Sequence, residues 1–500
     1  MSDASPVDMR TRIVAPIVFG CLLLACDDGR PAGPSADQQS RYAESRAELD
    51  ALMREIGIPG LQVALIVDGE VMFRDALGVR STATGAPMTT ETTFLTGSMI
   101  AKILLAEALL QMEAEGRVDL GAPVLDHLPW LPLEPISEGV TLRQLLSMRS
   151  GIWSRPIRGQ CPDPSLRAQL EGDGPPHAST PPGEAWLYTN YGYGVGAAVL
   201  EAVEGRPWTE VVRERVESPL GLSGTNDTRI AMTRDHSMTH SIAPDGTVTE
   251  HEIDAMPHCA PGFDCSVCEE FRAGAGYHAS ADDMARMVLA FMHHRAPFDD
   301  AAGARATDPV TSPGYGEGYA YGYGTSSFEA RGEHWIQAGS EFGGVAANTF
   351  WIPARRFGVI LIANAMGPSI AGELAVAGDA IATRFLDLPA EPPDLSTPSS
   401  TWSRYVGRYA SATSFRDLYE VTQSPDGSLR VTSPFWDPGS AADLLQGSAW
   451  PSFPAIGGDT FHYVDPGSGE DTDVTFFADS SGVVRHMASY GKYLATRSEP

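Results

Sequence analysis

Lysine is almost absent from this chain of 500 residues: only two of its 35 basic side chains are lysines, and the rest are arginines. One of the two, Lys102, lies four positions after Ser98 at the start of an apolar stretch. Arginine stays protonated in proteins, whereas a desolvated lysine can lose its proton and activate a neighbouring hydroxyl group. Lys102 is therefore a candidate general base, and the alternative is an incidental lysine.

Positive charge is scarce in general. The formal net charge is −29 and the isoelectric point is near 4.7, and no basic patch interrupts the acidic sequence. Such a surface would repel a phosphate backbone, so we exclude a nucleic-acid partner. The hydrophobic content of 43% is sufficient for a large core, and the chain is long enough for two folded units.

Cysteine is also rare, with six residues, of which two lie near the N-terminus. The other four are Cys161, Cys259, Cys265 and Cys268. An even number of thiols in an oxidising compartment favours two disulfides, with three possible pairings. Zinc binding is the alternative, because His258 adjoins Cys259 and because Cys265 and Cys268 have the spacing of metal ligands.

Long apolar runs are absent except near the N-terminus, where two arginines precede residues 13–25. This run is short for a membrane span and typical of a signal-peptide core. Its end, Leu23-Leu24-Ala25-Cys26, resembles a bacterial lipobox, which implies cleavage before Cys26 and lipid attachment to its thiol. We predict a signal peptide of the lipoprotein type over 1–25, a tether over 26–45, and an exported, periplasmic or extracytoplasmic protein with a lipid anchor in a bacterial membrane. The alternatives are an ordinary secretory signal and cleavage before Cys21.

The pattern of apolar residues then predicts strands and helices. Two strands flank Asp68-Gly69, a dipeptide typical of a tight hairpin turn. Apolar residues at helical spacing indicate helices in the middle of the chain, and Ser280 is a predicted N-cap for one of them. The predicted strands are 61–67, 71–79, 335–338, 346–352 and 357–363, and the predicted helices are 100–116, 140–146, 195–203, 281–293 and 369–386.

This order of elements predicts the α+β class, with an antiparallel sheet flanked by helices and a helical insertion after its first two strands. We assign this main domain to residues 46–388. Residues 389–401 are rich in proline and serine, which predicts a linker. Residues 402–500 alternate short β-rich runs with turns, which predicts a small C-terminal all-β accessory domain.

Several motifs of the main domain follow the order of one family. Phe94-Leu95-Thr96-Gly97-Ser98 with Lys102 resembles the active-site helix of serine β-lactamase-related hydrolases and penicillin-binding proteins. Tyr188-Thr189-Asn190 resembles the family's Tyr-x-Asn loop, and Gln337-Ala338-Gly339 lies where the family has its sheet-edge motif. The resemblance covers about residues 50–388 and is closest to the class C and esterase-like branch. It implies the β-lactamase/transpeptidase-like fold and acyl transfer through a serine ester, with no cofactor and no metal.

The resemblance also implies roles for individual residues. Ser98 is the implied nucleophile, and Lys102 and Tyr188 are the candidate bases that take its proton. Asn190 is implied to hold the substrate amide or to orient Lys102. The helix N-terminus places Ser98 in a positive field, where its backbone N–H can bind the developing oxyanion.

Three residues of the sheet edge are implied to bind substrate. Gly339 lets the substrate lie against the strand, and Ser340 supplies the second N–H of the oxyanion hole. Gln337 occupies the position where the family has lysine or histidine. Glutamine donates hydrogen bonds without carrying charge, so we expect weaker anchoring of a substrate carboxylate.

The spacing of Ser98 and Lys102 departs from the family, which has S-x-x-K where this chain has one residue more. If Lys102 keeps the family's register, Met99 takes the nucleophile's place and the site is inactive. If Ser98 keeps it, the two residues still share a helix face, and a π-bulge or a looser first turn can bring them together. We favour Ser98 as the acylated residue.

These observations lead to three hypotheses. The first is an exported serine hydrolase that acts through an acyl-serine intermediate on a small-molecule or peptide substrate, which is an ester, a D-amino-acid peptide or a β-lactam. The second is a catalytically impaired relative that binds a peptidoglycan fragment or a protein partner. The third, a metal-dependent hydrolase that uses His293 and His294 or the Cys/His cluster, lacks a matching carboxylate pattern.

Overall fold

The computed structural model describes residues 33–152, 165–251, 269–298 and 319–389, except residues 173, 179, 185, 227, 232, 244, 294, 296, 297, 368 and 369. Of the C-terminal region it describes residues 399–410, 418–432, 442–446, 460–464, 471–478, 483–489 and 493–497. All six cysteines, His258 and His294 lie outside these residues, so the signal peptide, the lipid anchor, the disulfides and the zinc site stay predictions. Within the described part, no helix is both long and apolar enough to cross a membrane.

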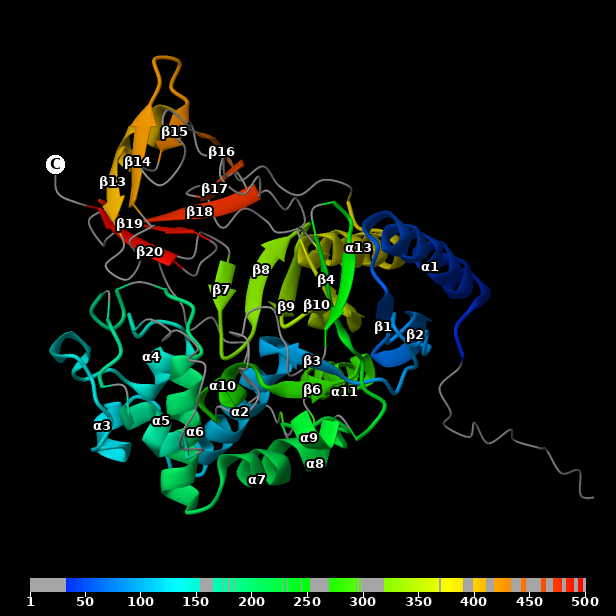
Figure 1. Ribbon diagram of the computed structural model, residues 1–500, viewed down its shortest axis with the longest axis horizontal. Helices are drawn as coiled ribbons and strands as arrows, with labels where there is room; N and C mark the ends of the chain where they lie inside the picture. Colours follow the sequence, from blue (N-terminus) through cyan, green and yellow to red (C-terminus); the bar gives the residue numbers. More distant parts are fainter. Residues whose placement is uncertain are drawn as a thin grey trace, which may run out of the picture.

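A seven-stranded antiparallel sheet forms the centre of the main domain, in the order β2-β1-β11-β10-β9-β8-β7 (Figure 1). All five predicted strands belong to it, and two further strands extend one edge. At the predicted hairpin turn, Asp68 and Gly69 have φ of 55° and 80°, values that a tight two-residue turn requires. The strands are β1 (Gly60–Val67), β2 (Glu70–Gly78), β7 (Tyr319–Tyr321), β8 (Ser326–Ala330), β9 (Glu333–Phe342), β10 (Val345–Ile352) and β11 (Phe357–Ala363).

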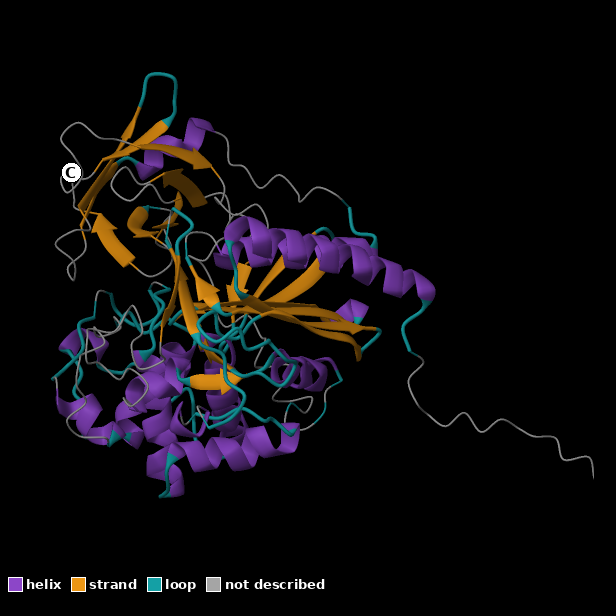
Figure 2. Ribbon diagram, turned by 45° about the vertical axis from the view of Figure 1, so that its right-hand side comes forward, coloured by secondary structure: helices purple, strands orange, loops and turns teal. Residues whose placement is uncertain are grey.

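Helices cover both faces of this sheet (Figure 2). The terminal helices α1 (Ala36–Ile56) and α13 (Ile370–Leu386) pack on one face, and α2 (Ser98–Ala114) and α11 (Ala281–Met292) pack on the other. Neighbouring residues of β10 show the alternation, because Phe350 lies against Gly378 of α13 while Thr349 contacts Met99 of α2. Side chains of β9 and β10 therefore face either the terminal helices or the start of α2.

The helix α1 corrects the predicted tether over residues 26–45. It begins at Ala36, where Ser35 and Gln38 form a capping box: the Gln38 N–H donates to Ser35 Oγ at 3.2 Å, and the Ser35 N–H donates to Gln38 Oε1 at 2.8 Å. Tyr42 stacks on Phe73 of β2 with ring centroids 4.2 Å apart. The prediction was wrong over 36–45. The segment is polar and was therefore interpreted as a tether, although Ser35 and Gln38 are a helix-capping pair.

The predicted helical insertion lies between β2 and β7 and contains two small sheets beside its helices. One sheet pairs β3 with β6, and the other has the order β12-β4-β5. Its helices are α2, α3 (Val124–His127), α4 (Leu142–Leu146), α5 (Leu166–Gly172), α6 (Tyr191–Glu204), α7 (Trp208–Val212), the π-helix Arg213–Glu217, α8 (Ser218–Leu220), α9 (Thr228–Ala231), α10 (Glu269–Ala275) and α11. Its strands are β3 (Phe94–Gly97), β4 (Thr239–Ile242), β5 (Val248–His251) and β6 (Tyr277–Ala279), and β12 (Ala365–Met366) comes from the segment after β11.

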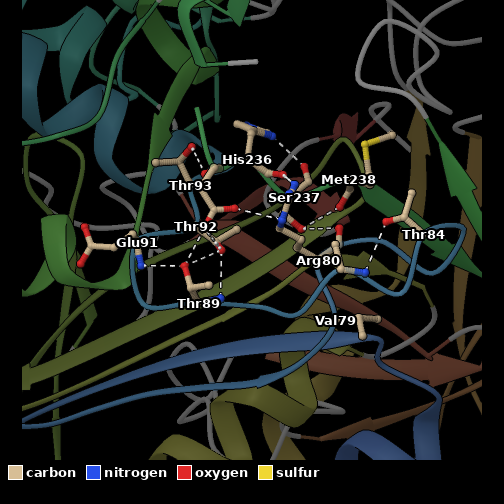
Figure 3. A network of polar contacts seen from close by, with 12 residues as sticks. Val79, Arg80, Thr84, Thr89, Glu91, Thr92, Thr93, His236, Ser237 and Met238 are labelled. Carbon is tan, nitrogen blue, oxygen red and sulfur yellow. Dashed lines mark hydrogen bonds and ion pairs between the residues drawn. The ribbon is translucent and has the colours of Figure 1, made fainter. Parts of the chain in front are cut away.

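A polar network stands at the start of β3 (Figure 3). The Asp235 carboxylate accepts hydrogen bonds from Thr89 Oγ1 at 2.6 Å and Thr92 Oγ1 at 3.0 Å, and it lies 3.0 Å from Arg80 Nε. The Thr93 N–H donates to the backbone oxygen of Asp235 at 2.8 Å. This Asp235 network, made of Arg80, Thr89, Thr92 and Asp235, joins the segment 80–92 to Asp235, which lies 143 residues after Thr92.

The C-terminal region forms the predicted all-β unit as a closed barrel (Figure 1). Aromatic and aliphatic side chains fill its interior, among them Tyr405, Tyr409, Phe461 and Phe476. The short helix η5 (Ser399–Tyr405) begins before the predicted end of the linker at residue 401. The strands are β13 (Gly407–Ala410), β14 (Leu418–Gln423), β15 (Leu429–Thr432), β16 (Ala442–Gln446), β17 (Thr460–Val464), β18 (Asp471–Ala478), β19 (Val484–Ser489) and β20 (Tyr493–Arg497).

Candidate active site

Ser98 is the first residue of α2, directly after the short strand β3. A bulge between Leu95 and Gly97 interrupts the pairing of β3 with β6, and the Thr96 hydroxyl donates to Tyr277 O at 2.9 Å. Gly97 has φ of 57° and ψ of −132°, a backbone conformation that glycine adopts at little cost. This strand-to-helix turn leaves Ser98 partly exposed while the next residues of α2 are buried.

Lys102 is almost fully buried, and its Nζ atom forms hydrogen bonds with four residues of the described part of the chain. They are Ser98 Oγ at 3.0 Å, Tyr188 OH at 2.8 Å, Asn190 Oδ1 at 2.6 Å and Gly274 O at 2.7 Å. All four are uncharged groups, and two of them are hydroxyls that can also donate a proton. We call these five residues the Lys102 network.

Two segments outside α2 bring the other three partners to Lys102. Asn190 precedes α6, and Tyr188 lies two residues earlier, where its ring packs near that of Trp186 with centroids 6.3 Å apart. Gly274 lies in the last turn of α10, where helix carbonyls have no partner within the helix and can accept a bond from a side chain. A Cβ atom at Gly274 would lie only 3.0 Å from Asn190 Oδ1, so this glycine permits the close approach of α10.

The hydroxyl of Tyr188 is protonated at neutral pH. Burial raises the pKa of Tyr188 to about 12, and a hydrogen bond with Ser98 opposes this effect. Tyr188 therefore links Lys102 and Ser98 as a neutral phenol, which can give up its own proton only if it receives another. This protonation state argues against a tyrosinate base, so of the two candidate bases Lys102 is the one that the site favours.

The structure resolves the question of register in favour of Ser98. Its Oγ atom faces Lys102, whereas Met99 is fully buried on the other side, where its sulfur lies 3.5 Å from Thr349 Oγ1. The anticipated π-bulge or loose turn is absent from α2, which is α-helical from Ser98 onward. The π-helix of this region lies instead at Arg213–Glu217. Residues four apart on an ordinary helix are close enough for the contact, so no distortion is needed.

Ser340 lies beside the start of α2. A Cβ atom built on Gly97 would come within 2.5 Å of Ser340 Oγ, so β9 passes directly against the turn that carries Ser98. In β9, pairing with β8 extends from Glu333 to Gln337, and Gly339 and Ser340 lie beyond that paired stretch. Gly339 is exposed. The edge of β9 next to Ser98 thus has the position that an extended substrate requires.

The prediction that Gln337 binds substrate is wrong. Gln337 is buried, pairs with Phe350 of β10, and donates from Nε2 to Asn348 Oδ1 at 3.3 Å. Because side chains alternate along a strand, Gln337 shares the sheet face of Phe350, which α13 covers, and points away from Ser98. Ile336 and Ala338 face the α2 side instead. The lysine or histidine position of the family is thus occupied by a residue that stabilises the sheet.

Sequence reasoning missed several residues around Lys102. Gly274 lies in the small-residue stretch Ala273-Gly274-Ala275-Gly276, which was the available signal for a close approach to the site. Tyr193 places its ring 5.2 Å from Lys102 Nζ, and Tyr321 of β7 hydrogen-bonds to Tyr193 and packs edge-on against Trp186 at 5.7 Å. Tyr321 lies in a Gly- and Tyr-rich run before β8, and this composition was the available signal for it in the sequence.

His293, named in the metal hypothesis, has a structural role. Its Nε2 atom lies 2.7 Å from Gly69 O in the β1–β2 turn. Among the described residues, no group of three or more His, Cys, Asp or Glu side chains is arranged to hold a metal ion.

The sequence matches the Beta-lactamase family over residues 46–382. Penicillin-binding protein 4 of Amycolatopsis lactamdurans is 30% identical over 187 residues, which are 36% of this chain and 48% of that protein. Esterase EstB of Burkholderia gladioli is 26% identical over 383 residues, 69% of this chain and 96% of that protein. D-aminopeptidase of Gluconobacter oxydans is 26% identical over 384 residues, 73% of this chain and 66% of that protein.

Solved structures have the same fold. SurE superposes with a TM-score of 0.66 and 24% identity, covering 92% of this chain and 100% of that one. The octameric penicillin-binding protein homologue from Pyrococcus abyssi has a TM-score of 0.60 and 19% identity, covering 91% of this chain and 100% of that one. With the family match over most of the main domain, and with Ser98 held against Lys102 at the sheet edge, this chain belongs to the β-lactamase family.

Proposed function

We propose that this protein is a serine hydrolase that forms an acyl ester on Ser98. The observation that carries the proposal is the 3.0 Å contact between Lys102 Nζ and Ser98 Oγ, which the longer spacing in the sequence does not prevent. A general base must lie within hydrogen-bond reach of the proton that it takes, and Lys102 meets this requirement. The family supports hydrolase activity in general, and the roles of individual residues are our proposal.

The hydrogen-bond pattern supports Lys102 as the base. Asn190 Oδ1 and Gly274 O can only accept, so they take up two N–H groups of the lysine. A neutral amine then has one lone pair left, which can accept the proton of the Ser98 hydroxyl, whose oxygen lies 3.0 Å from Nζ. In acylation the Ser98 O–H bond breaks, its proton goes to Lys102 Nζ, and Ser98 Oγ forms a bond with the substrate carbonyl carbon.

Tyr188 is suited to protonate the leaving group. It is a neutral phenol at neutral pH and contacts Lys102 Nζ at 2.8 Å. When the tetrahedral intermediate collapses, Tyr188 gives its proton to the departing oxygen or nitrogen and receives one from the Lys102 ammonium. The lysine returns to the amine form and can activate a water molecule for hydrolysis of the acyl ester.

The start of α2 and the edge of β9 are suited to stabilise the oxyanion. The N–H of Ser98 lies at the positive end of a helix of 17 residues, and Ser340 lies against the turn before it. Two converging N–H donors are the usual arrangement for stabilising a tetrahedral intermediate.

We propose an ester or a D-amino-acid peptide as the substrate class, ahead of a β-lactam. Gln337 carries no charge and points to the opposite face of the sheet, and the neighbours that face the α2 side are Ala338 and Ser340. This stretch of β9 therefore supplies no cation for a substrate carboxylate. The names of two relatives, an esterase and a D-aminopeptidase, point to the same two classes.

Labelling with an acyl-serine probe tests the proposed function. The folded wild type should react with a fluorophosphonate, and Ser98→Ala should lose at least about 10³-fold in rate because the attacking oxygen is gone. The double variant Ser98→Ala/Met99→Ser places a hydroxyl in the alternative register and should stay unlabelled. A folded wild type that reacts with neither a fluorophosphonate nor a fluorescent penicillin would favour the non-catalytic binder.

We also propose that the protein is exported and held at a membrane by a lipid on Cys26. The lipobox-like sequence before Cys26 supports this proposal. In a bacterial host fed a radiolabelled fatty acid, the wild type should become labelled and sediment with membranes. Cys26→Ser should lose both properties, whereas Cys21→Ser should keep them. Labelling that persists in Cys26→Ser and disappears in Cys21→Ser would show that the lipid is attached at the earlier cysteine.

A further inference from the structure

Tyr193 lies with its ring over Lys102, while its hydroxyl bonds to Leu146 O. The residue is fully buried in the first turn of α6, three positions after Asn190, and its ring centroid is 5.2 Å from Lys102 Nζ. The centroid of the Tyr188 ring is 4.7 Å from the same nitrogen, but Tyr188 contacts Lys102 through its hydroxyl at 2.8 Å. The Tyr193 ring therefore lies at a distance at which a cation is attracted to the negative ring face, and it makes this contact without its hydroxyl.

The hydroxyl of Tyr193 forms hydrogen bonds with Leu146 and Tyr321, so the ring is the part of this side chain that contacts Lys102. The Tyr193 O–H donates to Leu146 O at 2.9 Å, and the same oxygen accepts a hydrogen bond from Tyr321. Burial raises the pKa of Tyr193 well above its ordinary value, which keeps this phenol neutral. These two bonds fix the ring on α4 and β7 and hold its orientation toward the lysine.

An aromatic ring distinguishes the two protonation states of Lys102. When Lys102 takes the proton of Ser98, a positive charge forms in a site where the side chain is 1% exposed and the four hydrogen-bond partners are uncharged. A ring quadrupole stabilises the ammonium form and has little effect on the amine. The benefit therefore arises as the proton moves, which is the condition for lowering a barrier.

We propose that Tyr193 is a positioning residue of the hydrolase whose ring face stabilises the Lys102 ammonium formed during acylation. This inference rests on the proposed function of Ser98 and Lys102. It assigns a role to a residue outside the Ser, Lys, Tyr and Asn motif positions, and it predicts that the electron density of the ring, rather than the hydroxyl, sets the ease of protonation.

The scarcity of lysine permits a direct test. Protein made with ¹³C-labelled lysine gives signals from only two side chains, Lys102 and Lys492, and Lys492→Arg assigns them. The titration midpoint of Lys102 is then measured with Phe or 3,4,5-trifluorophenylalanine at position 193. Both lack the hydroxyl and keep the shape of the ring, but fluorine removes electron density from its face. The same fluorinated residue at Tyr42, across the sheet, is the matched control.

The fluorinated ring at position 193 should lower the midpoint of Lys102 by roughly 0.4–1.5 pH units relative to Phe, and the limb of the acylation pH profile should move with it. The control at Tyr42 should leave the midpoint unchanged. Equal titration midpoints of Lys102 with Phe and with the fluorinated ring at position 193 would overturn the proposal, because the electron density of the ring would then have no effect. The NMR measurement needs no activity, so a protein without acyl transfer refutes the proposed function separately.

Discussion

Two polar networks stand at opposite ends of the four-residue strand β3. The Asp235 network precedes it at Thr92, and the Lys102 network follows it at Ser98. Both join segments that are distant in sequence, and both use hydroxyl groups as partners. They differ in whether their members can exchange protons with one another.

In the Asp235 network every group has a fixed role. A carboxylate accepts from two threonines and faces an arginine, so opposite charges compensate each other. In the Lys102 network an amine, an alcohol and a phenol share one set of contacts, and Ser98 is partly exposed. The proposed catalytic role of the Lys102 network depends on this difference: its protons can be exchanged and Ser98 is partly exposed, whereas the charges of the Asp235 network compensate each other and join two parts of the fold.

The largest expected effect is that of Lys102→Arg. Arginine keeps the positive charge but cannot act as a base, so the acylation rate should fall roughly 10²–10⁴-fold. Single-turnover labelling measures the rate, and circular dichroism of the same sample establishes that the variant is folded. A rate within threefold of the wild type would remove the proposed difference between the two networks.

Asp235→Ala should affect stability and leave the chemistry intact. Loss of the carboxylate leaves Arg80, Thr89 and Thr92 without their shared acceptor, and the free energy of unfolding should fall by about 3 kcal/mol. Urea denaturation measures this change, and the acylation rate per folded molecule should stay constant. Glu91→Ala is the control, since only the backbone N–H of Glu91 takes part, at 3.2 Å from Thr89 Oγ1. A selective loss of rate would show that the Asp235 network also positions Ser98.

Glu217 makes stability depend on pH near β6. Burial raises its pKa from 4.5 to about 7, with Asp283 acting in the same direction and Arg213 opposing. The folded protein therefore keeps a proton that the unfolded chain loses above about pH 4.5, so stability should decline as the pH rises from about 4.5 to 7.

Glu217→Gln tests this prediction because glutamine resembles the protonated acid and cannot ionise. It should flatten the decline and make the protein about 2 kcal/mol more stable than the wild type at pH 8. Urea midpoints across the pH series measure the difference, and Glu138→Gln on the exposed surface should reproduce the wild-type slope. Parallel curves for wild type and Glu217→Gln would contradict the assignment.

The smallest expected effect is that of Gly274→Ala. The added Cβ would lie 3.0 Å from Asn190 Oδ1 and 3.1 Å from its Cβ, so Asn190 must shift away from Lys102. We expect about a tenfold lower acylation rate, because displacement of a positioning group by a fraction of an ångström weakens the geometry of proton transfer. Gly172→Ala is the matched control, since a Cβ there meets no atom within 4 Å. Equal rates for the two variants would show that Asn190 does not orient the lysine.

Local features were predictable where neighbouring residues alone determine the backbone conformation, as in turns and helix caps. Asp68-Gly69 adopts the positive φ angles of a tight turn, and Ser280 caps α11 by accepting from the Asp283 N–H at 3.2 Å. The capping box of Ser35 and Gln38 had the same local basis and was overlooked. The ordered motifs around Ser98 and Asn190 indicated the family, because each motif is a local sequence pattern.

The face to which a side chain points was not predictable in the same way. Gln337 was placed in the site from its motif, but its direction depends on the phase of β9 relative to β10 and α13. Tyr193 was not assigned a role, because an aromatic residue at helical spacing most often belongs to the core. Its position over Lys102 results from the packing of α6 against α2 and α4.

The sequence alone determined that a rare lysine shares a helix face with a serine, since positions four apart on an α-helix are neighbours in any context. It could not determine whether Ser98 or Met99 occupies the position of the nucleophile next to Lys102. The tertiary structure decided this, because the distant partners of Lys102 come from α10 and from the segment before α6, and the packing of Met99 against β10 fixes the rotation of α2. Contacts between segments that are distant in sequence depend on the fold, and local spacing does not specify them.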